Sequence, residues 1–317
     1  MRSPQRPSQG EEQVAGARAQ IGTDYAAPMV PAEAGPIQRL QPRPDRGGKK
    51  GGLARRVVTN VGPPLAVAAV VVGIWLLLSY VVLSSTQRFL LPPPQEVVKV
   101  GFLDWENLRE VLVMGLLPTT QVAMSGLAIA IVLGMLWAIL MSQAAWIERS
   151  TYPYAVVIQT IPIIAIVPLV GILIGFNFKG RVLACVIISI FPIITNTLFG
   201  LKSADASLQD LFTLHGASRR TRLIKLQLPA ALPAIFTGFR ISAGLSVIGA
   251  IVGDFFFRQG NPGIGRLIDI YRAQLQGEQL ITTIFFSSLL GITVFWGFGY
   301  LGNRLIRSWH ESAQGRR

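Results

Sequence analysis

Long apolar runs, six in number, constrain the fold of this sequence more than any other feature. A helix needs about 20 residues, at a rise of about 1.5 Å each, to cross roughly 30 Å of hydrocarbon. Backbone amides in lipid must be satisfied internally, which makes each run a helix. Only 14% of the 317 residues are charged, too few for a water-soluble globule. We therefore predict an all-α membrane protein with six transmembrane helices, at residues 65–83, 118–141, 155–176, 182–200, 234–256 and 280–306.

The first 56 residues differ from the rest in composition. They are rich in Pro, Gly, Gln and charged residues and have no sustained apolar period, which is typical of a disordered tail. Nucleic-acid binding is not expected of this basic arm, because it lacks interleaved aromatic residues on which bases would stack. The predicted organisation is a cytoplasmic tail (residues 1–56), a transmembrane domain (57–310) and a short cytoplasmic tail (311–317).

The distribution of basic residues predicts the orientation in the membrane. With the N-terminus in the cytoplasm, twenty of the 29 Lys and Arg residues fall in cytoplasmic segments, and eight, including Arg181 and Arg258, fall in outer segments. This bias follows the positive-inside rule. We expect a multi-pass protein of the inner or plasma membrane with both termini in the cytoplasm. The amphipathic stretch 97–113 is expected at the outer surface.

The cytoplasmic segment at residues 201–233 has a pattern suited to binding a partner. Gly216 can take the positive φ that lets one short helix end and another begin at an angle. Leucines alternate with basic residues after this glycine, giving an apolar and a basic side, and Pro229 marks the entry to the next span. Three apolar residues precede the glycine: Leu211, Phe212 and Leu214. The pattern predicts a helical hairpin that inserts into a groove of a partner.

At these residues the sequence resembles the permease subunits of binding-protein-dependent ABC importers. Their cytoplasmic signature is Glu-Ala-Ala, three residues, Gly, nine residues, Ile, one residue and Leu-Pro. Here nine residues follow Gly216, and then come Leu226, Gln227, Leu228 and Pro229. The first half departs from the signature, with Asp210-Leu211-Phe212 in place of Glu-Ala-Ala. Segments 161–169, 191–201 and 228–241 are similar to the nitrate, sulfonate and taurine type of this family.

The resemblance implies a type I ABC importer permease fold over about residues 60–310. It also implies four partners: a second copy in a homodimer, cytoplasmic ATPase subunits, an extracytoplasmic substrate-binding protein and the lipid membrane. The implied function is ATPase-driven movement of a small solute, either a nitrate-, sulfonate-, taurine- or bicarbonate-like anion or an aromatic vitamin precursor. The residues implied to dock the ATPase are Asp210, Leu211, Phe212, Leu214, His215, Gly216, Leu226, Leu228 and Pro229.

Polar residues stranded in the apolar runs are the candidates for the translocation path. Asp254 is the one acid within a run, and intramembrane acids are functional candidates by default; pairing with Arg258 is the alternative. Prolines at 162 and 192 free backbone carbonyls and would give a polar, bendable wall. The candidate path residues are Gln159, Thr160, Thr195, Asn196, Ser242, Ser246 and Asp254.

The sequence predicts no catalytic or metal site. It contains no Gly-x-x-x-x-Gly-Lys-Ser/Thr phosphate loop, so ATP is expected on the partner ATPase, and no cofactor is expected on this chain. The two histidines, His215 and His310, lie in cytoplasmic segments. A self-contained secondary transporter without an ATPase is an alternative function, and it would show inverted repeats. A membrane-embedded enzyme is another, and it would need clustered His, Asp or Glu near one membrane face.

Overall fold

The computed structural model describes residues 53–257 and 262–306, and all regular elements in these ranges are helical. Residues 1–52 and 307–317 hold most of both predicted tails and lie outside the described residues, so the tail predictions stay predictions. The chain separates into two units, Met1–Pro63 and Pro64–Arg317. In chain order the elements are α2 (Leu53–Leu77), η1 (Leu78–Val82), η2 (Arg88–Leu90), α3 (Pro94–Val98), η3 (Lys99–Leu103), α4 (Trp105–Arg109), η4 (Glu110–Leu116), α5 (Leu117–Gln143), α6 (Ala145–Thr160), α7 (Ile163–Ile174), α8 (Phe178–Lys202), α9 (Ala206–Leu214), α10 (Arg219–Arg222), η5 (Leu223–Gln227), α11 (Leu228–Phe256), α12 (Ile264–Ala273) and α13 (Gly277–Ile306).

Five helices of the described part are long and apolar enough to cross a membrane. They are Val61–Val82, Trp105–Gln143, Phe178–Lys202, Arg219–Phe256 and Gly277–Leu305. Each contains one of the predicted spans or nearly all of it. The predicted third span, residues 155–176, is instead a bent pair formed by α6 and α7, and counting that pair as one span gives six.

The bend between α6 and α7 corrects the expectation of a continuous third helix. The two helices meet at an angle of 99°. Ile161 takes an extended conformation, with φ −73° and ψ 126°, because the residue before a proline is disfavoured in the helical region. Pro162 is the N-cap of the next helix, so the predicted span is broken about a third of the way along it.

Two other prolines do not interrupt their helices, and Pro229 lies at the entry to the next span, as predicted. Pro118 and Pro229 stand in the first turns of α5 and α11, where a proline ring is tolerated. Each of these helices is directly preceded by a π-helical turn, η4 or η5. The predicted outer stretch and the predicted cytoplasmic hairpin therefore each run straight into the helix that follows.

The core of the second unit lies where α8 packs between α5 and α11. A Cβ on Gly126 of α5 would lie 2.3 Å from Cys185 Cβ, and a Cβ on Gly249 of α11 would lie 3.0 Å from Cys185 Cα. Side chains larger than hydrogen at these two positions would therefore push the helices apart. Buried aliphatic residues fill the contact, among them Ile193 and Ile194, both at 0% exposure.

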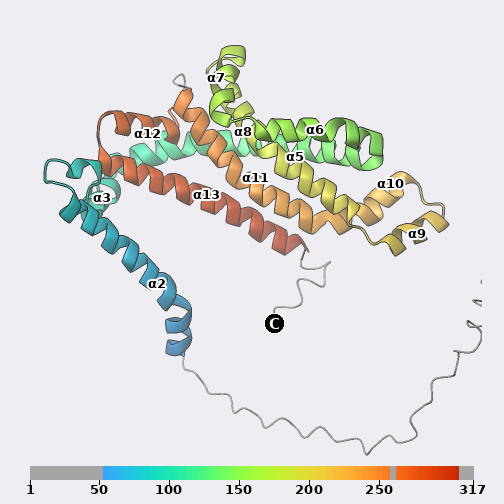
Figure 1. The fold of residues 1–317 in the computed structure, drawn as a ribbon, viewed down its shortest axis with the longest axis horizontal. Helices are drawn as coiled ribbons and strands as arrows, with labels where there is room; N and C mark the ends of the chain where they lie inside the picture. The colour runs from blue at the N-terminus through green and yellow to red at the C-terminus, as the bar shows by residue number, and fades with distance from the viewer. Residues whose placement is uncertain (1–52, 258–261, 307–317) are drawn as a thin grey trace, which may run out of the picture. The chain divides into compact units, whose positions relative to one another are not determined.

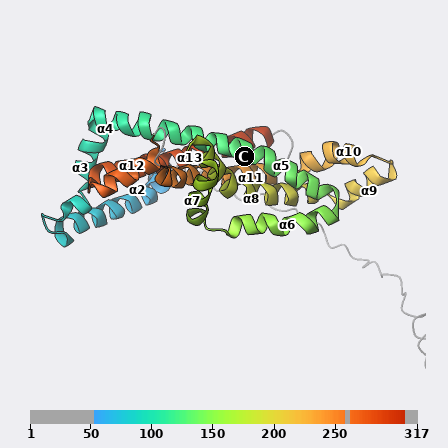
Figure 2. The same ribbon diagram turned by 90° about the horizontal axis from the view of Figure 1, so that it is seen from above.

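Within this unit, the two short-helix groups lie at opposite ends of the long helices. Figures 1 and 2 both show α9 and α10 at one end of the bundle, and α3 and α12 at the other. α13 packs along α11, and α3 and η3 contact α13. In the span Val61–Val82, only 6% of the most apolar window is buried. A membrane-crossing bundle with such ends presents different elements to the two aqueous sides.

Candidate functional site

The short helix α9 begins and ends with well-defined caps. Asp205 caps its N-terminus by accepting a hydrogen bond from Ser207 N at 2.8 Å, and bonds from Ser207 hold the pKa of this carboxyl below its ordinary value. At the C-terminus, Gly216 N donates to Thr213 O and Ala217 N donates to Phe212 O, both at 3.0 Å. These paired bonds form a Schellman motif, which requires a left-handed residue at Gly216.

Gly216 has φ +64°, which confirms the positive φ predicted from its position. A Cβ built on Gly216 would meet nothing within 4 Å. The requirement for glycine is therefore conformational and not a matter of space. This turn sets the direction in which the chain leaves α9 and enters α10.

A row of leucines on α9 is exposed at the end of the bundle. Leu208 and Leu211 are exposed to 45% and 47%, and Leu214 is exposed to 85%. Their spacing of three residues places them along one side of the helix. Asp210, His215 and Gly216 are also exposed, whereas Phe212 is half-buried. The end of α9 thus presents apolar surface that a partner could cover.

The remaining predicted docking residues lie in the arm that follows α9 and α10 and leads into α11. Leu226 is 8% exposed, and Leu228 and Pro229 are half-buried. Leu228 packs against the cluster of Leu201, Ala231 and Ile235, which joins the end of α8 to the start of α11. Arg222 Nη2 also donates to Thr213 Oγ1 at 3.0 Å, which ties α10 to α9. The arm is therefore fixed to the long helices of the core.

At the opposite end of α11, Asp254 lies in a fully buried ion pair that sequence reasoning did not find. Arg181 Nη1 donates to Asp254 Oδ1 at 2.9 Å, and the two side chains are 5% and 0% exposed. Arg181 was predicted in an outer loop, but it stands in the first turn of α8, inside the protein. The other predicted partner, Arg258, lies outside the described residues. No local sequence signal links positions 73 residues apart.

The same carboxylate also anchors the start of α12. Thr119 Oγ1 donates to Asp254 Oδ2, and Ile264 N donates to Thr119 Oγ1 at 2.8 Å. A Cβ on Gly263 would lie 1.8 Å from Asp254 Oδ2, so the chain passes directly over the carboxylate. Asp254 therefore joins α5, α8, α11 and the entry to α12.

The other predicted path residues do not converge on one cavity with Asp254. Ser242 and Ser246 are 0% exposed and donate to backbone carbonyls, Ser242 to Ser189 O at 2.6 Å and Ser246 to Ala243 O at 3.0 Å. Thr195 and Asn196 are half-buried and bond to carbonyls one turn earlier in α8. Gln159 and Thr160 are exposed at the end of α6. A path role for these seven residues stays a prediction.

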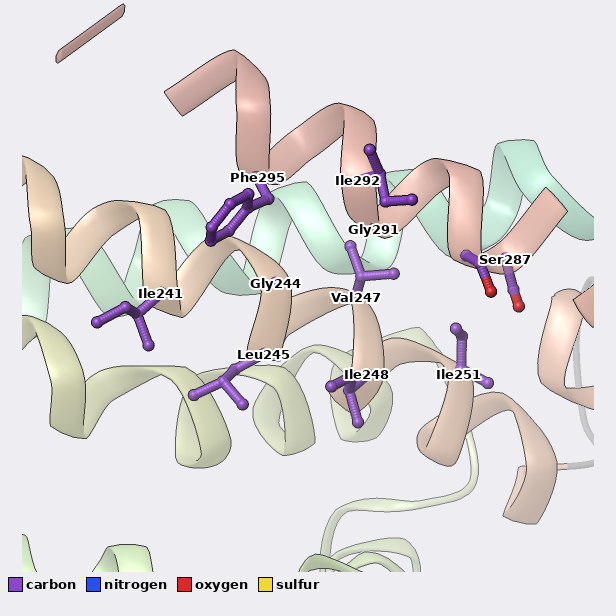
Figure 3. Close-up of a pocket in the computed structure, with 11 residues that line it drawn as sticks. Ile241, Gly244, Leu245, Val247, Ile248, Ile251, Ser287, Gly291, Ile292 and Phe295 are labelled. Atoms are coloured by element: carbon purple, nitrogen blue, oxygen red, sulfur yellow. The ribbon is translucent and has the colours of Figure 1, made fainter. Parts of the chain in front are cut away.

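A groove that the sequence did not predict lies between α11 and α13. Its volume is about 530 Å³, and its floor and walls come from both helices (Figure 3). None of the seven predicted path residues lines it. Among residues 53–257 and 262–306, no group of three or more His, Cys, Asp or Glu is placed to hold a metal ion.

Comparison with known proteins yields one family and several relatives. Residues 130–307 match the family described as "Binding-protein-dependent transport system inner membrane component". The chain is 38% identical to the formylaminopyrimidine transport permease protein ThiX of Halalkalibacterium halodurans, over 69% of this chain and 86% of that protein. It is 28% identical to the riboflavin transport system permease protein RibX of Chloroflexus aurantiacus, over 73% of this chain and 85% of that protein.

A solved structure shares the fold. The inward-facing MetNI methionine ABC transporter matches with a TM-score of 0.54 and 17% identity, and the match covers 62% of this chain and 95% of that chain. At this identity the likeness establishes the helical architecture alone. Together with the family match, this architecture confirms the predicted type I importer permease fold.

Proposed function

The chain belongs to the family of inner-membrane components of binding-protein-dependent transport systems, and from this premise we propose how it is energised and what it carries. It is an ABC importer permease that moves a small solute. The family and the named relatives support an ATP-driven permease over the alternative of a self-contained secondary carrier. We propose four further points: how the chain binds an ATPase, how its copies assemble, how it is oriented in the membrane and which solute it carries.

The proposed ATPase contact is the exposed end of α9. The observation that carries it is the leucine row ending at Leu214, which is 85% exposed on a helix held by two caps and a fixed arm. A contiguous exposed apolar row of this kind marks an interaction site, and helix-in-groove binding uses residues at such a spacing. Each ATPase subunit would receive α9 in a surface groove.

Co-purification tests this contact directly. The tagged chain is expected to retain the ATPase subunit after detergent extraction, and the double variant Leu211→Asp/Leu214→Asp is expected to lose it, because charges would enter an apolar groove. Thr213→Asp is the matched control, since Thr213 is exposed roughly 200° from Leu211 on the same helix, at 100° per residue, and a carboxylate there can still accept from Arg222. Equal retention by the double variant and the control would remove α9 from the interface.

The proposed assembly contains two copies of this chain, two ATPase subunits and an extracytoplasmic binding protein. Both termini are proposed to be cytoplasmic, on the same side as α9. The cluster of Arg219, Arg220 and Arg222 beside α9 supports this orientation, because positive charge is retained on the cytoplasmic side. The binding protein would then approach the end that carries α3 and α12. Labelling of single cysteines in intact cells tests the orientation.

The proposed solute is a small nitrogen heterocycle of the pyrimidine or flavin class. The names of two relatives, formylaminopyrimidine and riboflavin permeases, support this class, and the pyrimidine permease is 38% identical over 69% of this chain. Uptake of a labelled formylaminopyrimidine by cells that carry the permease, its ATPase and its binding protein tests it. Uptake of nitrate or taurine in place of the heterocycle would contradict this proposal.

A further inference from the structure

The groove between α11 and α13 is kept open by glycine. A Cβ on Gly244 would have Phe295 Cδ2 as its nearest neighbour at 4.0 Å, and a Cβ on Gly291 would have Val247 Cγ1 at 3.9 Å. These contacts are ordinary, so neither glycine is required for helix packing. Gly249, on the opposite side of α11, differs because a Cβ there would lie 2.8 Å from Ile188 Cγ2. Glycine at 244 and 291 leaves volume that alanine or leucine would fill.

The two ends of the groove differ in chemistry. At one end, Ser287 Oγ and Ser288 Oγ each donate to Ile284 O, at 2.7 and 2.9 Å, and their oxygens keep acceptor capacity. At the other end, Phe295 lies against the guanidinium of Arg240, whose Cζ is 4.1 Å from the ring centroid. Apolar residues of α11 make the wall between these ends (Figure 3).

Arg240 is the observation that favours water over lipid tails at this face. It lies 16 residues before the end of α11 at Phe256, which is about 24 Å at 1.5 Å per residue and within the roughly 30 Å of hydrocarbon. Its side chain is exposed in the single chain. Charged side chains at membrane depth almost always face a bundle interior or a water-filled cavity. A groove bordered by Arg240 is therefore expected to face water and solute.

The lining selects a flat ring over a small inorganic anion. An anion that leaves water needs several N–H donors or a free cation around it, whereas the groove walls offer two hydroxyls and its one bordering cation is stacked on Phe295. A heteroaromatic ring would stack on aromatic and apolar surface. Its ring amino groups would donate to the serine oxygens. A volume of about 530 Å³ is within the range of about 300–1,000 Å³ found for small-molecule sites.

We propose that the α11–α13 groove, defined by Gly244, Ser287, Ser288, Gly291 and Phe295, is this chain's contribution to the solute passage and that it binds an uncharged heteroaromatic ring during transport. This assignment rests on the proposed function and deepens it by naming the surface that meets the solute. In this proposal the groove, and not the buried serines of α11, contacts the solute. Ser242 and Ser246 already donate to backbone carbonyls inside the helix packing.

Cysteine accessibility tests the proposal in the reconstituted complex with ATPase and binding protein. Cys185 is buried and is the one cysteine of the sequence, so Cys185→Ala gives a clean background. The test variant adds Ser287→Cys, in the groove, to this background. The matched control adds Thr293→Cys, which is exposed roughly 200° from Gly291 on the same helix. The probe is a charged methanethiosulfonate, which reacts with a thiolate in water and not with a thiol in lipid.

We expect Ser287→Cys to react at least about tenfold faster than Thr293→Cys, since one lies in water and the other in lipid. A formylaminopyrimidine should slow the reaction at Ser287→Cys, and nitrate should not. No reaction at Ser287→Cys would mean that lipid fills the groove. A disulfide between two copies without reaction would mean that the groove is a subunit interface, and equal protection by nitrate would remove the preference for a ring. Each of these three results overturns the proposal.

A larger side chain that fills the groove provides a second, independent test, with solute uptake as the measurement. Gly291→Leu is expected to lower uptake at least about tenfold while the ATPase still co-purifies, because α9 is at the far end of the bundle. Gly297→Leu on the same helix is the control, since a Cβ there meets nothing within 4 Å. Unchanged uptake by Gly291→Leu would contradict the proposal. Failure of the proposed function looks different: the wild-type chain would neither bind an ATPase nor accumulate any solute.

Discussion

Truncation of Leu214 should weaken ATPase binding more than truncation of any other residue on α9. Leu→Ala deletes three carbons, each worth about 0.8 kcal/mol when buried. Leu214 is 85% exposed in the free chain, so covering it completely makes about 2 kcal/mol available, which is roughly a 30-fold change in Kd. Leu211 is 47% exposed, and the same arithmetic gives about 1 kcal/mol, or roughly sixfold.

Titration of the labelled ATPase subunit against the permease in lipid nanodiscs measures these differences. Leu140→Ala is the control, because Leu140 lies on α5 and is 57% exposed, so the same carbons are lost away from the docking end. The expected order of weakening is Leu214→Ala, then Leu211→Ala, then Leu140→Ala with no effect. The reasoning is refuted if Leu214→Ala binds within about twofold of wild type, or if Leu140→Ala weakens binding as much.

Three further perturbations have defined outcomes. Gly216→Val should abolish ATP-driven uptake in membranes that still contain the protein, whereas Gly216→Asn should keep most of it, because φ +64° suits Asn and not a β-branched residue; equal uptake by the two would contradict the turn assignment. Asp254→Ala should cost about 3–5 kcal/mol of stability, because it leaves the Arg181 charge buried without its carboxylate. In thermal unfolding in detergent, the double variant Asp254→Leu/Arg181→Met should recover much of this loss. An Asp254→Ala protein that melts like wild type would show that the pair is not needed. Deleting residues 2–45 while keeping residues 49–56 should leave uptake unchanged, because the basic cluster still sets the orientation, and an inserted but inactive truncation would reveal a role for the tail.

Hydropathy predicts the membrane helices well because the length of an apolar run is a direct consequence of bilayer thickness. Backbone geometry is harder, since the same residue type acts differently in different surroundings. Pro162 follows an extended residue and breaks the third span, whereas Pro118 and Pro229 follow π-helical turns and stay inside long helices. Gly216 was predictable because its role depends on neighbours close in sequence.

Features that depend on distant packing could not be predicted. Arg181 appears in the sequence as one more outer cation, and only the packing of α8 on α11 brings it to Asp254. Likewise, Gly249 and Gly291 are both glycines in apolar helices. Gly249 permits close packing of α11 on α8, whereas Gly291 leaves the groove between α11 and α13 open. That difference is set by the neighbouring helix, which a single sequence does not specify.

The most direct test of the account is uptake into proteoliposomes that contain the permease with its ATPase, its binding protein outside and ATP trapped inside. The account predicts accumulation of a formylaminopyrimidine that needs all three components, persists when ion gradients are collapsed and stops in the Leu211→Asp/Leu214→Asp variant. Accumulation that proceeds without the ATPase and follows an ion gradient would contradict it, because the chain would then be a self-contained carrier.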